Sequence, residues 1–543
     1  MTPKLHYSIA PSTLTLLVLL ALVCGPAHAA DRFREFDANA DGKVTREESG
    51  NAPWFDTLDM NKDGVITREE AAKAARSKPR PARGGDPADP RGYDPNRPHP
   101  MPLSESKAFT DLQFTRDLEC GTQDRNGKLM TGTECNYLVA HGGRLYAAFS
   151  VWNHDPAAPN PGPGVLVKPS ATSPWEVDVQ FHPRNVRVPV LASLTFSIDV
   201  TGRRLDPPVN LLMSGSGSFE HRGQFTVQVR DDARGTWMPS FVASSQGVRS
   251  FEVRHLFVHR DRVTGVDRVI AAVTSGSVFS GGYDPTAPGL IRWSAEPELT
   301  NRQGRIMSHG EANGVAYLAV DITPGAPKNG GIFRRVDGPQ PHWEWIGEWG
   351  ERVQHRGVAW IRGLTGIPDP ANPGKELLLC SREVDGVIEV INPQRDHGVR
   401  VEFDVRKHFG GLLNARPGQR LTTIFAYNEM TPAEHFATGE RVHLISGGVM
   451  PGLRGDDARS KGAWCLIRHA GGRYASVRVF DPAVVPSGHG GLRCVRTICP
   501  SPFPEEKDRV LYFGGFDGGD LGTGMRHRDT AWIYKGTLKS KHP

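Results

Sequence analysis

The sequence lacks the short motifs that mark several common enzyme classes. It has no H-E-x-x-H zinc motif, no Walker phosphate loop and no G-x-S-x-G nucleophile elbow. It also has no Ser-x-Asp-x-Gly-x-x-Trp box of the kind found in sialidases. No C-x-x-C pair occurs, which argues against a redox or zinc-binding role. None of these chemistries therefore has a sequence signature here.

Neither sign of charge dominates the chain. The 65 basic and 60 acidic side chains leave a formal net charge of +5 over 543 residues, with no dense Lys/Arg run. This near balance argues against a nucleic-acid partner. Apolar stretches long enough to cross a bilayer are also lacking, so we expect no transmembrane segment. Glycine (61) and proline (43) are abundant, and they favour an all-β body with many turns.

The amino-terminal segment has the organisation of a secretory signal. Lys4 supplies the positive end, residues 14–23 form a short apolar core, and Ala27-His28-Ala29 fits the small-x-small cleavage pattern. We expect cleavage after Ala29 and a secreted or periplasmic protein. A lipid anchor on Cys24 is the alternative, although a valine precedes it where a small residue is expected.

An even number of cysteines remains after cleavage, and an exported chain permits disulfides. The sequence does not choose among the pairings. Two of the six, at positions 380 and 465, lie in apolar strand-like runs that also suit buried thiols. The six are Cys120, Cys135, Cys380, Cys465, Cys494 and Cys499.

Two twelve-residue segments, 37–48 and 59–70, repeat one pattern of oxygen-bearing side chains. Calcium is a hard cation that takes about six to eight oxygen ligands, which this spacing supplies. The segments resemble the loops of the EF-hand family, and the resemblance implies two calcium sites. The implied ligands are Asp37, Asn39, Asp41, the Lys43 carbonyl, Thr45 and Glu48, then Asp59, Asn61, Asp63, the Val65 carbonyl, Thr67 and Glu70.

The two loops are expected to pair. Val44 and Ile66 occupy the eighth positions, where a short antiparallel bridge joins paired EF-hands. Because the loops start only 22 residues apart, at 37 and 59, the intervening helices are short. We expect a structural or docking calcium site rather than a switch. The expected shared core is Phe33, Phe36, Trp54, Phe55 and Leu58.

Composition divides the chain into four parts. The signal segment covers residues 1–29, and the EF-hand pair covers 30–76. Residues 77–105 are rich in Pro, Arg and Gly, which is typical of an extended tether. Residues 106–543 form the large domain.

The large domain contains seven apolar runs of one character, each followed by a turn and a second strand. A further strand precedes them, so each unit suits a four-stranded blade. We predict a seven-bladed β-propeller closed by pairing of residues 107–119 with 531–539; six or eight blades, or two β-sandwiches, are the alternatives. The runs are residues 144–149, 209–214, 268–273, 314–319, 376–381, 441–446 and 509–514. Tryptophan often lies in or after the second strand, at Trp175, Trp237, Trp293, Trp345, Trp464 and Trp532.

The units resemble the generic Leu-Tyr-small blades of secreted bacterial propellers. Neither WD-type nor quinoprotein-type blade signatures occur. The resemblance implies the fold and names no activity.

Two sets of side chains are candidates for a site in the propeller. An arginine recurs just before the first strand of several units, and guanidinium groups that faced the channel would bind an anion. The alternative is that each arginine fastens its blade to the next. These residues are Arg249, Arg305, Arg356, Arg420 and Arg493.

His309 and Glu311 form the most enzyme-like stretch. Residues two apart on a strand face the same side, so the pair is a weak candidate for proton transfer or metal binding. A polar turn is the alternative.

The sequence favours an exported calcium-binding protein whose propeller binds a glycan, a protein or a surface polymer. A hydrolase or lyase acting on an anionic substrate in the axial channel is the alternative. Whether the protein is an enzyme stays open.

Overall fold

The computed structural model describes most of residues 37–70 and 112–539. The longest internal gaps are 152–161, 218–224, 242–251, 323–330, 349–360, 452–461, 481–491 and 518–528. The predicted signal segment and linker lie outside the described residues, as do Phe33, Phe36 and Trp54. The chain divides into two units, one with the calcium loops and one with the blades. Among the described residues, no helix has the length and apolar character of a membrane span.

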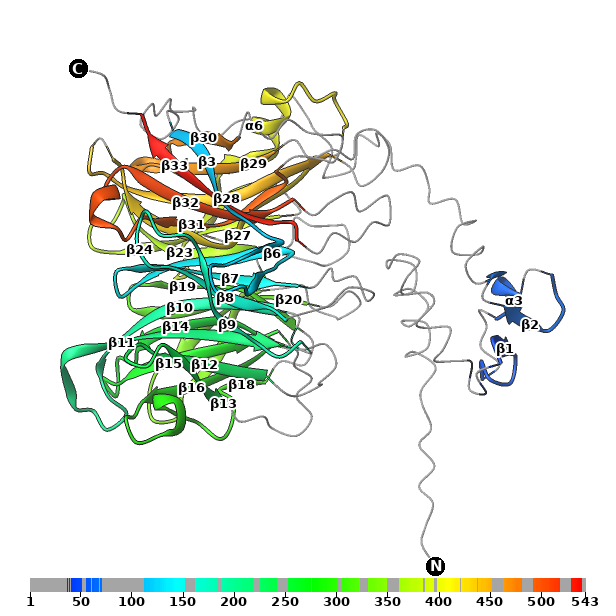
Figure 1. The fold of residues 1–543 in the computed structure, drawn as a ribbon, viewed down its shortest axis with the longest axis horizontal. Helices are drawn as coiled ribbons and strands as arrows, with labels where there is room; N and C mark the ends of the chain where they lie inside the picture. Colours follow the sequence, from blue (N-terminus) through cyan, green and yellow to red (C-terminus); the bar gives the residue numbers. More distant parts are fainter. Residues whose placement is uncertain are drawn as a thin grey trace, which may run out of the picture. The chain divides into compact units, whose positions relative to one another are not determined.

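The first unit is built around the bridge between the two loops. Strand β1 (Lys43–Thr45) pairs antiparallel with β2 (Val65–Thr67), and Val44 lies opposite Ile66. Helix α3 (Phe55–Leu58) adds Phe55 to a small buried cluster with these two residues. The predicted pairing of the loops is confirmed (Figure 1, blue).

The second unit contains seven four-stranded antiparallel sheets, one of which carries a short extra strand. In each sheet the first strand contacts the first strands of both neighbouring sheets, in a closed cycle. These inner strands therefore line the axis of a ring (Figure 1). They are β6 (Glu134–His141), β10 (Arg187–Ile198), β14 (Val253–Arg260), β19 (Gly304–Ala312), β23 (Ile361–Pro368), β27 (Leu421–Glu434) and β31 (Cys494–Pro500).

The second strands coincide with the seven apolar runs. Their residues are almost all buried because they are covered on both faces by neighbouring blades, as in β7 and β32. The second strands are β7 (Arg144–Ser150), β11 (Arg204–Gly217), β15 (Asp267–Val273), β20 (Val315–Ile322), β24 (Glu376–Arg382), β28 (Arg441–Pro451) and β32 (Val510–Phe516).

Two further strands complete each blade. The third strands are β8 (Gly164–Lys168), β12 (Phe225–Asp231), β16 (Ser277–Tyr283), β21 (Gly331–Val336), β25 (Val387–Ile391), β29 (Ala463–Arg468) and β33 (Ala531–Leu538). The outer strands are β9 (Glu176–Gln180), β13 (Thr236–Phe241), β17 (Ile291–Trp293), β22 (His342–Glu348), β26 (Val399–Asp404), β30 (Tyr474–Val479) and β3 (Leu112–Glu119).

The ring is closed by the strand that precedes the first blade. Strand β3 pairs antiparallel with β33, with Leu112 opposite Leu538 and Glu119 opposite Trp532. The last blade thus takes strands from both ends of the domain, which removes an open sheet edge. The predicted closure and the count of seven blades are confirmed, and the two-sandwich alternative is wrong (Figure 1).

Short elements decorate the blades. Helix α6 (Val405–Leu412) follows β26, and Asp404 caps it by accepting a hydrogen bond from Lys407 N. Strand β18 (Leu299–Thr300) pairs with β16, and β4 (Thr122–Gln123) pairs with β5 (Leu129–Met130). The 3-10 turns are Pro288–Leu290, Ala470–Gly472 and Pro504–Glu506.

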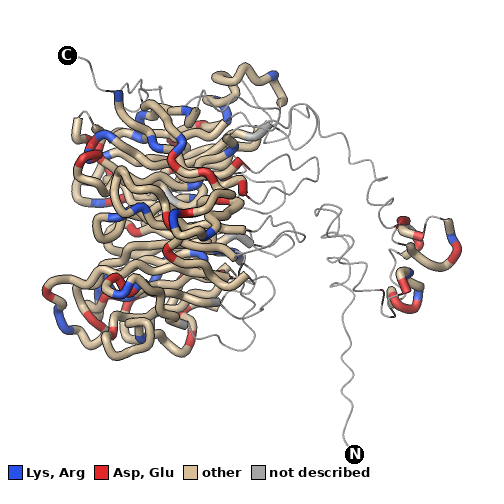
Figure 2. Tube along the Cα trace, viewed as in Figure 1, with Lys and Arg blue, Asp and Glu red and all other residues tan. Residues whose placement is uncertain are grey.

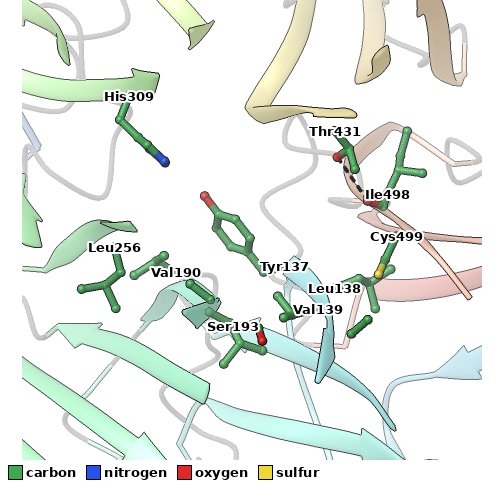
Figure 3. A pocket seen from close by; sticks show the side chains of 13 residues that line it. Tyr137, Leu138, Val139, Val190, Ser193, Leu256, His309, Thr431, Ile498 and Cys499 are labelled. Carbon is green, nitrogen blue, oxygen red and sulfur yellow. Dashed lines mark hydrogen bonds between the residues drawn. The ribbon is translucent and has the colours of Figure 1, made fainter. Parts of the chain in front are cut away.

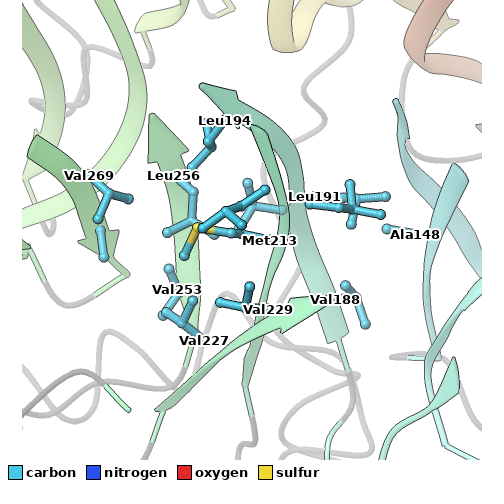
Figure 4. Close-up of a cluster of buried hydrophobic side chains, with 14 of the residues drawn as sticks. Ala148, Val188, Leu191, Leu194, Met213, Val227, Val229, Val253, Leu256 and Val269 are labelled. Carbon is cyan, nitrogen blue, oxygen red and sulfur yellow. The ribbon is translucent and has the colours of Figure 1, made fainter. Parts of the chain in front are cut away.

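Apolar side chains fill the space between neighbouring blades. Figure 4 shows Leu191 of β10 and Met213 of β11 packed with Leu256 of β14 and Val269 of β15. The six cysteines of the described residues are buried as thiols in this interior, and none of them forms a disulfide. Charged side chains of both signs are interspersed along the propeller strands (Figure 2), in keeping with the balanced composition.

A carboxylate shared between blades recurs at the blade interfaces. Asp178, on the outer strand of the first blade, accepts hydrogen bonds from Arg230 Nε and Nη2 at 3.0 and 2.9 Å. It also accepts one from Trp237 Nε1 at 2.6 Å. Arg230 and Trp237 both belong to the next blade, so one buried acid holds two blades together. We call this arrangement the blade clasp.

The clasp repeats with variations around the ring. Asp117 accepts from Lys168 and Trp175, Glu298 from Arg335 and Trp343, and Glu402 from Arg468 and Tyr474. At the interface of the second and third blades only the indole bond is kept, from Trp293 Nε1 to Ser240 Oγ at 2.8 Å.

Removing one clasp should destabilise the propeller strongly. Asp178→Ala leaves the buried Arg230 paired with Asp232 alone, and breaking a buried charge pair costs about 3–5 kcal/mol. Trp237→Phe removes one hydrogen bond to a charged group and should cost about 1.5–3 kcal/mol. Urea unfolding followed by tryptophan fluorescence measures both.

Glu344→Ala is the control, because its ion pair with Arg334 is about half exposed and should contribute at most about 1 kcal/mol. Equal loss of stability in Asp178→Ala and Glu344→Ala would contradict the clasp.

Candidate functional site

The two calcium loops fold alike, down to individual hydrogen bonds. Gly42 N donates to Asp37 Oδ2 and Gly64 N donates to Asp59 Oδ2, both at 3.0 Å. The glycines have φ values of 84° and 87°, a left-handed conformation that glycine adopts without strain. The first carboxylate of each loop is therefore folded over the sharp turn at its sixth position.

The last carboxylate of each loop is fixed by a capping box. Thr45 N donates to Glu48 Oε2 at 2.8 Å and Glu48 N donates to Thr45 Oγ1 at 3.2 Å. Thr67 and Glu70 repeat the arrangement at 3.0 and 3.2 Å. The hydrogen bonds from these threonines lower the pKa of both glutamates. Both side chains are therefore ionised at neutral pH, as a hard cation requires.

The loops fit a calcium ion. Asp37 is only 5% exposed, and its Oδ1 is buried without a hydrogen-bond partner among the described residues. An unpaired buried oxygen is costly, and a bound cation would supply its partner. Asn61 N donates to Glu70 Oε1 at 3.4 Å, which holds the third and twelfth positions of the second loop close together. Within each loop, hydrogen bonds thus hold the first acid over the sixth position and the last acid at the ninth. Among the described loop residues, no three acidic side chains come together as a ready-made metal site.

The axial channel is shaped by irregularities in the inner strands. All seven inner strands shift register against their second strands near the same point. A bulge of this kind leaves a residue unpaired and turns its side chain. Asn136, Arg254, Asn428 and Arg496 all lie within such shifts.

Five arginines from five inner strands meet in this part of the channel. The electrostatic neighbours of Arg254 include arginines of three other blades, so the side chains converge on the axis. Among the described residues, three carboxylates, Glu134, Glu252 and Glu383, pair with members of the set, two fewer than the arginines. We call this set the arginine layer; it consists of Arg187, Arg254, Arg305, Arg362 and Arg496.

Hydrogen bonds and an aromatic ring position the layer. Arg496 pairs with Glu134 and donates from Nη2 to Asn428 Oδ1 at 3.0 Å. The ring of Tyr427 lies between two guanidinium groups, with Arg496 at 3.8 Å and Arg362 at 4.5 Å from its centroid. Such cation–π contacts hold the two arginines in place across blade boundaries.

Several guanidinium donors of the layer are not used. Arg305 Nε and Arg496 Nε are buried without partners among the described residues. Arg254 makes one hydrogen bond, from Nη1 to Glu252 Oε1 at 3.3 Å. Burial, together with Arg305, Arg362 and Arg496, lowers the pKa of Arg254, which remains a cation at neutral pH. The layer thus combines unmet donors with mutual repulsion.

The predicted arginines stand as follows. Arg305 lies in the arginine layer, and Arg493 lies just before β31. Arg249, Arg356 and Arg420 lie outside the described residues. The remaining members of the layer were not singled out from the sequence. Arg254, Arg362 and Arg496 lie three to six positions after a predicted arginine, within the first residues of an inner strand, and Arg187 begins β10.

His309 and Glu311 face the same neighbouring strand but do not act as a pair. His309 Nδ1 lies 3.3 Å from His255 Nδ1, and its ring stacks on Phe257 at 4.3 Å. Glu311 Oε2 lies 3.2 Å from His259 Nδ1. Burial lowers the pKa of His309 to about 4, so the imidazole is neutral at pH 7. In the described part of the propeller, no three His, Cys, Asp or Glu side chains form a metal-ligating cluster.

A cavity of about 280 Å³ occupies the channel next to the arginine layer. Figure 3 shows the Tyr137 hydroxyl and the His309 imidazole pointing toward one another across it. Ser193 and Thr431 add hydroxyl groups, and most of the remaining wall is aliphatic.

Comparison with known proteins identifies the first unit. The model of the EF-hand family matches residues 29–48 and 51–70. A search of curated proteins gave no match. Solved propellers resemble the second unit only distantly.

Three of these structures illustrate the distance. An α-L-arabinofuranosidase of Fusarium graminearum is 11% identical, with 62% of this chain and 93% of that chain covered and a TM-score of 0.35. An α-L-arabinanase of Penicillium chrysogenum is 10% identical, with 79% of this chain and 98% of that chain covered and a TM-score of 0.35. A β-propeller domain of Myceliophteria thermophila is 14% identical, with 75% of this chain and 97% of that chain covered and a TM-score of 0.34. Values this low carry no conclusion about activity.

The chain therefore joins a pair of EF-hand calcium-binding motifs to a seven-bladed β-propeller.

The half-buried His309 should make stability depend on acid pH. Its folded pKa of about 4 lies below the ordinary 6.5, so the unfolded chain binds the proton first as pH falls. Its contribution to stability is present above pH 6.5 and is lost as pH falls toward 4; the loss is at most about 3 kcal/mol. His309→Gln should flatten this part of a stability-versus-pH curve measured by urea unfolding.

The control is His342→Gln, because His342 is an exposed histidine. A curve for His309→Gln as steep as that of the control would contradict the assignment.

Proposed function

We propose that this is an exported calcium-binding protein whose propeller binds an acidic glycan or surface polymer through the arginine layer. The arginine layer is the observation that carries the proposal. Five guanidinium groups against three carboxylates, largely shielded from water, repel one another unless an anion is bound. Guanidinium groups are also the side chains best suited to carboxylates and sulfates.

The calcium loops supply a second module. The ligands proposed from the sequence are held by bonds within each loop, and the small core of Val44, Phe55 and Ile66 joins the loops. A core of this size contributes little stability by itself, so bound calcium would add a large share of it. This supports a structural role for calcium.

The alternative is a hydrolase or lyase acting on an anionic substrate in the channel. One observation favours it: the neutral imidazole of His309 and the phenol of Tyr137 face the same cavity beside the arginine layer. An imidazole and a phenol can exchange protons with a bound substrate. If the galacturonate oligomers of the binding experiment below are cut into shorter products, the protein is an enzyme rather than a binding protein.

Binding of anions should depend on the arginine layer. Arg305→Gln removes a cation that has no direct hydrogen bond to a protein carboxylate, so the fold should be kept. Its affinity for galacturonate oligomers should fall about tenfold or more, since charged hydrogen bonds contribute about 1.5–3 kcal/mol. Isothermal titration at low and high salt measures the affinity and its screening.

Arg234→Gln makes the same change of charge at a side chain that is 78% exposed. It should bind like the parent protein. Equal affinities in Arg305→Gln and Arg234→Gln would refute binding in the channel.

Calcium binding should show two sites in the full chain. Glu48→Gln and Glu70→Gln each remove a chelating carboxylate, so each should lose one site in a calcium titration. Asp56→Asn is the control, because Asp56 lies in α3 outside both loops and its side chain is 70% exposed. If both glutamine variants keep two sites, the ligand assignment is wrong.

A further inference from the structure

The cavity beside the arginine layer belongs to the same channel. Tyr137 directly follows Asn136, and Leu256 and Ile498 lie two residues beyond Arg254 and Arg496 on the inner strands. A strand advances about 3.3 Å per residue, so the cavity begins about 7 Å along the strand from Arg254 and Arg496 and about 13 Å from Arg305, whose strand reaches the wall at His309. One ligand that extends along the axis can therefore contact two levels of the channel, the arginine layer and the cavity.

The two levels offer different chemistry. The arginine layer presents positive charge and unused donors. The cavity wall is mostly aliphatic and contains no carboxylate, lysine or arginine. A ligand that fills both levels needs an anionic group at one end and an uncharged body at the other.

The size and polar groups of the cavity limit that body. Its volume of about 280 Å³ lies at the small end of the range of ligand pockets, which suits a body of one ring. The aliphatic wall suits the faces of a ring. Four side chains add polar groups to it; Ser193 Oγ already donates to Asn210 and Thr431 Oγ1 to the Ile498 carbonyl, so these two hydroxyls can only accept from a ligand. The four are Tyr137, Ser193, His309 and Thr431.

We propose that the channel binds a six-membered ring bearing one carboxylate, with the carboxylate on the arginine layer and the ring in the cavity. This ligand class rests on the proposed function and makes it specific. The ring has two sources, the terminal uronic acid of an acidic glycan or a free cyclic carboxylic acid. His309 stays neutral because it is buried against Phe257 and His255, so it contacts the ring as a hydrogen-bonding group rather than as a cation.

The test compares anions with and without a ring on the full-length protein. Isothermal titration is carried out with D-glucuronate, benzoate and inorganic sulfate. At least one ring carboxylate should bind ten times more tightly than sulfate. Glucuronate as the tighter ring ligand indicates the glycan source, and benzoate indicates the free acid.

A variant with a filled cavity distinguishes the contribution of the ring to affinity from that of the anionic group. Ala192 lies in the wall, and Ala192→Phe should abolish the advantage of the ring while leaving sulfate affinity unchanged. Ala233→Phe makes the same change at an exposed turn outside the cavity and should bind like the parent. Ala140→Leu, at an exposed part of the wall, is a second filling variant should Ala192→Phe fail to fold.

Three results would overturn the inference, and they are distinguishable. Ring carboxylates that bind no more tightly than sulfate refute the ring site but keep the proposed anion binding. An unchanged ring advantage in the folded filling variants refutes the cavity as its location. The absence of binding by all three probes removes the proposed function as well.

Discussion

The propeller depends on a carboxylate that belongs to one blade and is bonded by the next. Asp178 and Glu402 are examples in which one buried acid satisfies a guanidinium group and an aromatic donor of the neighbouring sheet. A buried charge is stable only when it is paired, so each clasp fixes the distance and rotation between two blades. Asp117 extends the same arrangement to the blade that closes the ring. At these interfaces the clasps help to position the inner strands that line the channel.

The arginine layer has the opposite character. In the clasps, each buried acid is paired with a cation; in the channel, Arg254 shares Glu252 with Arg187, and Arg305 Nε has no hydrogen-bond partner among the described residues. The rigid ring keeps these guanidinium groups close together, although free side chains would move apart to reduce their electrostatic repulsion. Sites that bind ligands commonly keep such stored electrostatic energy, and the cost is offset when the ligand arrives.

The two units use acidic side chains for different ends. In the calcium loops, Asp37 and Glu48 accept hydrogen bonds from the backbone of their own loop, and such bonds lower the pKa of Glu48. In the propeller clasps, buried acids are already paired with donors from the neighbouring blade. The clasps also explain the recurrent tryptophans: Trp175, Trp237 and Trp293 are indole donors of the blade interfaces. In the fourth blade that role belongs to Trp343, whereas Trp345, two residues later, is half exposed.

The sequence alone determined the calcium loops, the seven buried second strands and the closing pair of strands. The reason is that ligand spacing, as from Asp59 to Glu70, and apolar runs, as in β32, act over a few neighbouring residues. Only the tertiary structure decided which arginines meet. Arg187 and Arg496 are far apart in sequence. Their convergence depends on the closed ring and on the bulges that shift the register of each inner strand next to its arginine. The cavity between Tyr137 and His309 is likewise set by the geometry of the closed ring, which no local pattern contains.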